Sequence, residues 1–327
     1  MLCLVAFLPA KGTHLAGAEL TYTCIGANQY RVRLVIFRDC LNGQAPFDNP
    51  VDLFIFNSSN GTVYNTWTIP APQLTPRLIP NNWDGCVGGN IPFCVEEGIY
   101  ETTITLPGQA GGYDIAWARC CRSNVIDNLT RPDCEGVTFL AHVPDPADAV
   151  CNNMPQFNNR PSLFLCAGQQ YYFDHSATDL DGDSLVYEIS NPYTGLDFNG
   201  MGAANSSGNC GFGLPSPVVS PNNPMGPPPY RNVAFSAGHS FNNPFGPGGY
   251  ININPATGYL EAFPATNGIY VLAISVKEYR NGILLSENKR DFQFYVINCQ
   301  IPDPAPVLTH DLSGLNFSGD TVFAQAG

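Results

Sequence analysis

Hydrophobic and polar residues alternate over short stretches through most of the chain, and no stretch of eleven residues between positions 18 and 143 has a helical period. In residues 30–38, for example, Val32, Leu34 and Ile36 occupy alternate positions, as in a strand with one buried face. Similar runs separated by Gly, Pro and Asn occur at residues 51–56, 62–69, 99–106, 113–120, 137–143, 170–173, 185–190, 250–253, 259–262, 268–278 and 289–297. The pattern predicts an all-β protein built from β-sandwiches.

The arrangement of these runs predicts two consecutive sandwich modules, at residues 13–147 and 148–300. Pro-Asp-Pro at residues 144–146 is the expected linker, because proline donates no hydrogen bond to a strand ladder. The second module carries a long insert rich in Gly, Pro and Asn at residues 199–249, a loop of the kind that is functional or disordered. We expect residues 301–327 to form a linker and the start of a further module, so that the chain is a fragment of a longer protein.

The amino terminus and the cysteine content indicate an oxidising compartment. Residues 1–12 contain a short apolar run followed by Ala-Lys-Gly, which predicts a truncated signal peptide cleaved near Thr13. The run is shorter than the roughly 20 residues of a membrane span, so we do not expect a membrane-spanning protein. Twelve cysteines without any C-x-x-C pair are typical of a disulfide-bonded exported protein. We therefore place the protein outside the cell or at the cell surface.

Cleavage would leave eleven cysteines, an odd number, so at least one is free or bonded to another chain, as in a homo-oligomer. Cys86 and Cys94 close a short loop, and they form the one pair that we predict. The remaining connectivity stays open, and a metal cluster is the alternative, although the spacings fit no zinc motif. The disulfide candidates are Cys24, Cys40, Cys86, Cys94, Cys120, Cys121, Cys134, Cys151, Cys166, Cys210 and Cys299.

The charge balance argues against a nucleic-acid partner. The chain has 27 Asp and Glu residues against 14 Lys and Arg residues, a formal net charge of −13, and no basic stripe. No motif supplies a nucleophile, a base and an orienting group together, so we do not expect an enzyme.

An acidic turn is the sharpest candidate site. Asp179, Asp181 and Asp183 alternate around Gly182. Calcium takes six to eight oxygen ligands, and three carboxylates this close repel one another unless a cation screens them. The turn therefore predicts a structural calcium site, with a solvated Asp/Gly turn as the alternative.

The second module resembles the bacterial cadherin-like/immunoglobulin-like repeat. The resemblance rests on the acidic turn, on Asn-Pro-Ala-Thr-Gly-Tyr-Leu at residues 254–260, and on the long predicted strand at residues 268–278. It implies a cadherin-like sandwich with a calcium-binding turn. Glu278 takes the place of the usual late Asp of the repeat, and is either a fourth calcium ligand or the partner of Arg280 or Arg290.

The first module resembles the amino-terminal region of large gliding-motility-associated surface proteins of Bacteroidetes-type bacteria. The motifs are residues 13–24, residues 30–40, Cys-Cys-Arg-Ser at 120–123, and Cys-Asn-Asn-Met-Pro-Gln-Phe at 151–157. The resemblance implies a multidomain adhesin-like or structural protein exported by the type IX secretion system.

Together, these features predict a non-enzymatic structural or adhesive module of a large secreted surface protein, stiffened by disulfides and calcium, with other surface proteins or glycans as partners. The alternative is a carbohydrate-binding or accessory module of a secreted hydrolase. Core packing is the expected role of most aromatic residues, but the candidates for stacking on sugar are Trp67, Trp83, Tyr193, Tyr230 and Phe245.

Overall fold

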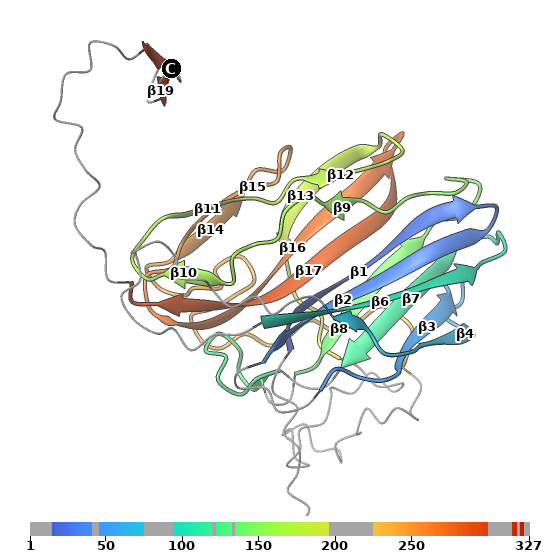
Figure 1. Cartoon of the computed structure of the whole chain (residues 1–327), viewed down its shortest axis with the longest axis horizontal. Helices are drawn as coiled ribbons and strands as arrows, with labels where there is room; N and C mark the ends of the chain where they lie inside the picture. The colour runs from blue at the N-terminus through green and yellow to red at the C-terminus, as the bar shows by residue number, and fades with distance from the viewer. Residues whose placement is uncertain are drawn as a thin grey trace, which may run out of the picture. The chain divides into compact units, whose positions relative to one another are not determined.

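The computed structural model describes residues 15–40, 46–74, 95–119, 122–132, 135–195, 225–299, 316–318 and 321–323. These residues contain no α-helix, and their strands form several mainly antiparallel sheets (Figure 1), which confirms the all-β prediction. The described residues from 15 to 298 form one compact unit. The described part of a small second unit contains the hairpin of β18 (Asn316–Ser318) and β19 (Thr321–Phe323).

The strands agree closely with the expected runs. Those of the first half are β1 (Leu15–Gly26), β2 (Gln29–Asp39), β3 (Val51–Asn57), β4 (Val63–Ile69), β5 (Gln73–Leu74), β6 (Val95–Thr105), β7 (Tyr113–Arg119) and β8 (Val137–Val143). Those of the second half are β9 (Gln156–Phe157), β10 (Phe164–Cys166), β11 (Tyr171–Asp174), β12 (Ala177–Thr178), β13 (Ser184–Ser190), β14 (Tyr250–Ile253), β15 (Tyr259–Phe263), β16 (Gly268–Arg280) and β17 (Ile283–Ile297). The long strand β1 and the short strands β5, β9, β10 and β12 were not among the expected runs.

The largest sheet contains strands from both halves of the chain. Its order is β13-β16-β17-β1-β2-β6-β5, and β10 pairs in parallel with β17. β1 meets β17 where Gly17 lies opposite Phe292 and Ala18 lies opposite Asp291. Glycine permits this close approach, because a Cβ atom on Gly17 would lie 2.7 Å from the carbonyl oxygen of Asp291. The division into modules at residue 147 stays a prediction, and the sheet joins strands from both sides of it.

Two hydrophobic cores lie against this sheet, and β2 contributes alternate residues to each. Leu34 and Ile36 belong to the core shared with the four-stranded sheet β4-β3-β7-β8. Phe37 belongs to the core shared with β16, β17 and the three-stranded sheet β11-β15-β14, and Val35 packs against that core. The alternation of side chains along a strand therefore builds two sandwiches on one sheet (Figure 1).

Buried polar contacts connect residues 122–132 to the second half. The guanidinium of Arg122 pairs with both carboxylate oxygens of Asp291, and both side chains are at most 5% exposed. The side chain of Asn128 donates to the carbonyl oxygen of Val271 at 2.7 Å and accepts from its amide at 2.9 Å. These contacts satisfy groups that would be costly to bury alone.

The long insert is described from residue 225 onward. Met225 and Tyr230 pack with Phe56 and Ala116 in a small core, and Phe245 lies in the core beneath the three-stranded sheet. This part of the insert is therefore packed against the sandwiches.

Candidate metal centre

The acidic turn connects β12 to β13 and is held by its own first carboxylate. Oδ1 of Asp179 accepts hydrogen bonds from the backbone N–H groups of Asp181, at 3.0 Å, and Asp183, at 2.8 Å. Gly182 lies between them with a φ of 80°, a conformation that side chains other than glycine adopt at a cost. The local sequence therefore fixes the positions from which the carboxylates project.

Glu278 reaches the same place from β16. The pairing of β16 with β17 is irregular between Glu278 and Tyr279, and such bulges re-aim side chains. The Glu278 side chain is fully buried, and its Oε2 accepts from Nδ2 of Asn152 at 2.9 Å and from Oγ of Ser286 at 2.5 Å. Asp179, Asp183 and Glu278 each present a carboxylate oxygen within 4.8 Å of the other two, an arrangement that can hold a metal ion.

Two oxygen atoms of this cluster have no hydrogen-bond partner. They are Oδ2 of Asp179 and Oε1 of Glu278, and both are buried. Burial raises the pKa of Glu278 to about 8, and the carboxylates of Asp183 and Asp179 also raise it. A bound cation would supply the missing partner and favour the ionised carboxylate, so the donor set fits a hard metal ion.

Asp181 does not belong to this group of three. Its two carboxylate oxygens each accept a hydrogen bond of 2.8 Å from Asn153, one from the backbone amide and one from the side chain. Arg280 pairs with both oxygens of Asp183, at 2.8 and 2.6 Å, and lowers the pKa of that carboxyl. The structure thus brings together three of the four expected ligands, and metal binding itself stays a prediction.

The two arginines that were alternative partners of Glu278 contact other carboxylates. Besides pairing with Asp183, Arg280 lies 3.6 Å from Asp181, while Nε of Arg290 donates to Oε2 of Glu19 at 3.1 Å. Asn152 and Ser286 donate hydrogen bonds to the Glu278 carboxylate, and a protonated Glu278 can also donate to the carboxylate of Asp183.

A segment of three residues, Cys151 to Asn153, connects this cluster to the first sandwich; we call it the junction segment. Cys151 forms a disulfide with Cys24 on β1, 127 residues earlier in the chain. Asn153 accepts a hydrogen bond from the backbone amide of Cys24 at 3.0 Å while it donates to Asp181. In the sequence, this segment stands out only as part of the motif at residues 151–157. Its two adjacent asparagines beside a cysteine were the available signal for a polar bridge.

Other cysteines are also disulfide-bonded, as the sequence predicted for an exported protein. They include Cys40, Cys166 and Cys299. Cys86 and Cys94 lie outside the described residues, so their pairing stays a prediction. The other candidates outside the described residues are Cys120, Cys121, Cys134 and Cys210.

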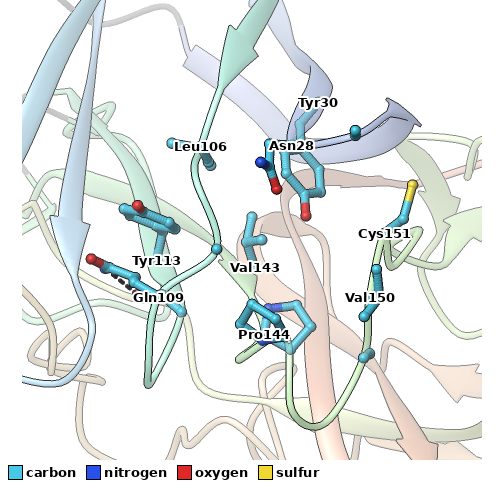
Figure 2. A pocket seen from close by; sticks show the side chains of 14 residues that line it. Asn28, Tyr30, Leu106, Gln109, Tyr113, Val143, Pro144, Val150 and Cys151 are labelled. Carbon is cyan, nitrogen blue, oxygen red and sulfur yellow. Dashed lines mark hydrogen bonds between the residues drawn. The ribbon is translucent and has the colours of Figure 1, made fainter.

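A small hollow of about 140 Å³ lies beside Cys151 at one end of the first sandwich (Figure 2). Figure 2 shows Leu106, Val143 and Pro144 among its lining residues, so the walls are largely apolar. The amide of Gln109 is occupied by hydrogen bonds to the carbonyl oxygen of Gly112 and to Asn57. The hollow therefore offers few polar groups to a ligand.

A second cavity, of about 300 Å³, is lined by Asp114, His142 and Lys289 among others. Nδ1 of His142 lies 2.8 Å from Asp114 and 3.4 Å from Oγ of Ser58. A catalytic triad uses the two opposite ring nitrogens of histidine, whereas here one nitrogen faces both groups. This arrangement does not form a proton relay.

The aromatic residues named as sugar-stacking candidates serve mainly in packing. Tyr230 and Phe245 are buried, and Trp67 packs against the first core while its indole N–H donates to Thr102. The ammonium group of Lys289 lies 3.7 Å from the centroid of the Tyr193 ring, in a cation–π contact. Trp83 lies outside the described residues.

Comparison of the chain with family models, curated proteins and solved structures finds no match. Within the described part of the chain, no helix has the length and apolar character that a membrane crossing requires.

Proposed function

We propose that the chain is a non-enzymatic extracellular module of a large secreted surface protein, structural or adhesive in role, in which calcium stiffens the connection between the two sandwiches. Its classification as cadherin-like, its relation to gliding-motility-associated proteins and its export by the type IX system are parts of the proposal that rest on sequence resemblance.

The junction segment is the observation that carries the proposal. It bonds to β1 through the Cys24–Cys151 disulfide and to the acidic cluster through Asn152 and Asn153. A cation held by Asp179, Asp183 and Glu278 would therefore order a region that is already connected to the first sandwich. Such an ion would have a structural role, because the residues around it form hydrogen bonds that hold the junction segment in place.

The choice of calcium follows from the donors. The group offers carboxylate oxygens, without cysteine or histidine among the three residues, and oxygen-only sites suit calcium and magnesium. Calcium also accepts irregular geometry and is abundant outside cells, where its protein sites typically have dissociation constants of about 10⁻⁴ to 10⁻³ M.

Thermal unfolding of the whole chain with calcium and with chelator tests this proposal. At a calcium concentration ten times the dissociation constant, the stabilisation is about 1.4 kcal/mol, or about 2–3 °C in the melting temperature of a unit of this size. Asp179→Asn should reduce the shift. Asp181→Asn, the same change on the same turn, should retain it, because Asp181 lies outside the group of three carboxylates that face one another. Equal melting temperatures for the wild type with and without calcium would contradict the proposal.

A further inference from the structure

The three-stranded sheet β11-β15-β14 lies left of centre in Figure 1, and its outer face gathers aromatic residues. Along β15, Leu260 and Ala262 are buried in the core, so the residues between and beside them face outward. The resulting surface, which we call the aromatic face, consists of Tyr172, Tyr250, Tyr259, Glu261 and Phe263.

Its four rings form two pairs. The rings of Tyr172 and Tyr259 are 6.0 Å apart between centroids and inclined by 19°, and those of Tyr250 and Phe263 have the same separation and inclination. Tyr172 and Tyr259 are 52% and 50% exposed. Exposed apolar residues that occur singly are normal on protein surfaces, whereas a gathered group marks a binding surface.

Polar groups are set between the two pairs. Glu261 lies between Tyr259 and Phe263 on the same face of β15, and these two aromatic residues are about 13 Å apart along the strand. The hydroxyl of Tyr250 donates to Oε1 of Glu261 at 2.7 Å and accepts from the amide of Gln170 at 2.6 Å. Among the described residues, the second carboxylate oxygen of Glu261 has no hydrogen-bond partner, so it can accept from a ligand.

We propose that the aromatic face binds a neutral carbohydrate chain. Sugar rings present C–H groups of partial positive charge, which the electron-rich faces of aromatic rings attract. Their hydroxyl groups would donate to the second carboxylate oxygen of Glu261, whereas both carboxylate oxygens of Asp174, which lies opposite Tyr259, already accept from Ser176 and Asn159. Two ring pairs separated along the strand suit an oligosaccharide better than a single sugar. The two carboxylates and the absence of Lys and Arg from these three strands disfavour an anionic glycan.

This inference is independent of the calcium site. Asp179 and Glu278 belong to the turn after β12 and to β16, and the aromatic face belongs to other strands. The sugar would bind to the aromatic face. None of the five aromatic residues that the sequence suggested for sugar stacking belongs to this face.

Affinity electrophoresis and calorimetry of the whole chain test the inference, with laminarin, xylan, mannan and cello-oligosaccharides as neutral probes and heparin as the anionic probe. We expect binding of at least one neutral probe and none of heparin. Tyr172→Ala or Tyr259→Ala should weaken binding by about tenfold or more, equivalent to about 1.4 kcal/mol. Glu261→Gln should weaken it less, because the amide oxygen still accepts a hydrogen bond. The matched control is Tyr64→Ala, which removes a similarly exposed tyrosine from β4 and should leave binding unchanged.

Three results would overturn the inference. One is the absence of binding to every neutral probe. Another is equal affinity of the wild type and both aromatic variants, with Glu261→Gln also unchanged. A third is a wild-type dimer in light scattering that Tyr172→Ala converts to a monomer without any glycan binding, since this face would then join two copies of the chain.

Discussion

Asn152 donates a hydrogen bond from Nδ2 to Oε2 of Glu278 at 2.9 Å, although the two residues are 126 positions apart in the chain. The same asparagine accepts a bond from Arg280 at 3.3 Å, and its neighbour Cys151 is bonded to Cys24. A polar residue of the junction segment therefore contacts the candidate metal centre directly. The order of that centre and the attachment of the first sandwich depend on the same few residues.

The buried pair of Arg122 and Asp291 should contribute strongly to stability. Arg122→Met leaves the Asp291 carboxylate buried without its partner, and we expect the free energy of unfolding to fall by about 3–5 kcal/mol. The matched control is Arg31→Met, because Arg31 and Glu101 form an exposed pair at 3.8 Å whose loss should cost less than about 1 kcal/mol. Urea unfolding of both variants measures the difference, and equal losses would contradict the prediction.

The Cys24–Cys151 disulfide should stabilise the chain by limiting its unfolded state. It closes a loop with a sequence separation of 127 residues, so the double variant Cys24→Ser, Cys151→Ser should lose about 2–5 kcal/mol. Non-reducing peptide mapping of the wild type verifies the bond, and denaturant unfolding measures the loss. An unchanged unfolding midpoint in the double variant would show that this cross-link has no such role.

Glu278 should contribute less and less stability to the metal-free protein as the pH rises from about 4.5 towards 8, and comparison with Glu278→Gln isolates this effect from that of buried His175, whose lowered pKa acts in the opposite direction up to about pH 6.5. The pKa of Glu278 is raised to about 8 from its ordinary 4.5, so between these values the folded state keeps a proton that the unfolded state releases. Stability from this residue is full below pH 4.5 and is lost as the pH rises through 8. Glu278→Gln removes this contribution.

Urea midpoints in chelator at several pH values measure the effect. The free energy of unfolding of Glu278→Gln should rise relative to that of the wild type between pH 5 and pH 8. A constant difference between the two proteins across that range would contradict the assigned shift.

The strands could largely be predicted from the sequence because hydrophobic alternation reports which face of a strand is buried. For example, the alternation of Val32, Leu34 and Ile36 predicted β2. β1 was not among the predicted runs, since two of its buried positions are Ala16 and Ala18, which give a weak hydrophobic signal. Its pairing with β17 depends on residues more than 270 positions away, a relationship that no local pattern contains.

The candidate centre could be predicted only in part for a related reason. The spacing of Asp179, Asp181 and Asp183 predicted the turn. The spacing alone does not show which of the three carboxylates face one another. The fold separates them, because Asp179 and Asp183 each present an oxygen within 4.8 Å of Glu278, whereas Asp181 accepts hydrogen bonds from Asn153. That contact arises from the junction segment and becomes apparent only when the chain is folded.

Calorimetric titration of chelator-treated whole chain with calcium at pH 8 tests the central claim most directly. We expect one calcium ion per chain at this site, with a dissociation constant of about 10⁻⁴ to 10⁻³ M. Glu278→Gln should abolish or greatly weaken that binding, and Asp181→Asn should preserve it. Absence of calcium binding to the wild type, or binding that Glu278→Gln leaves unchanged, would contradict the account.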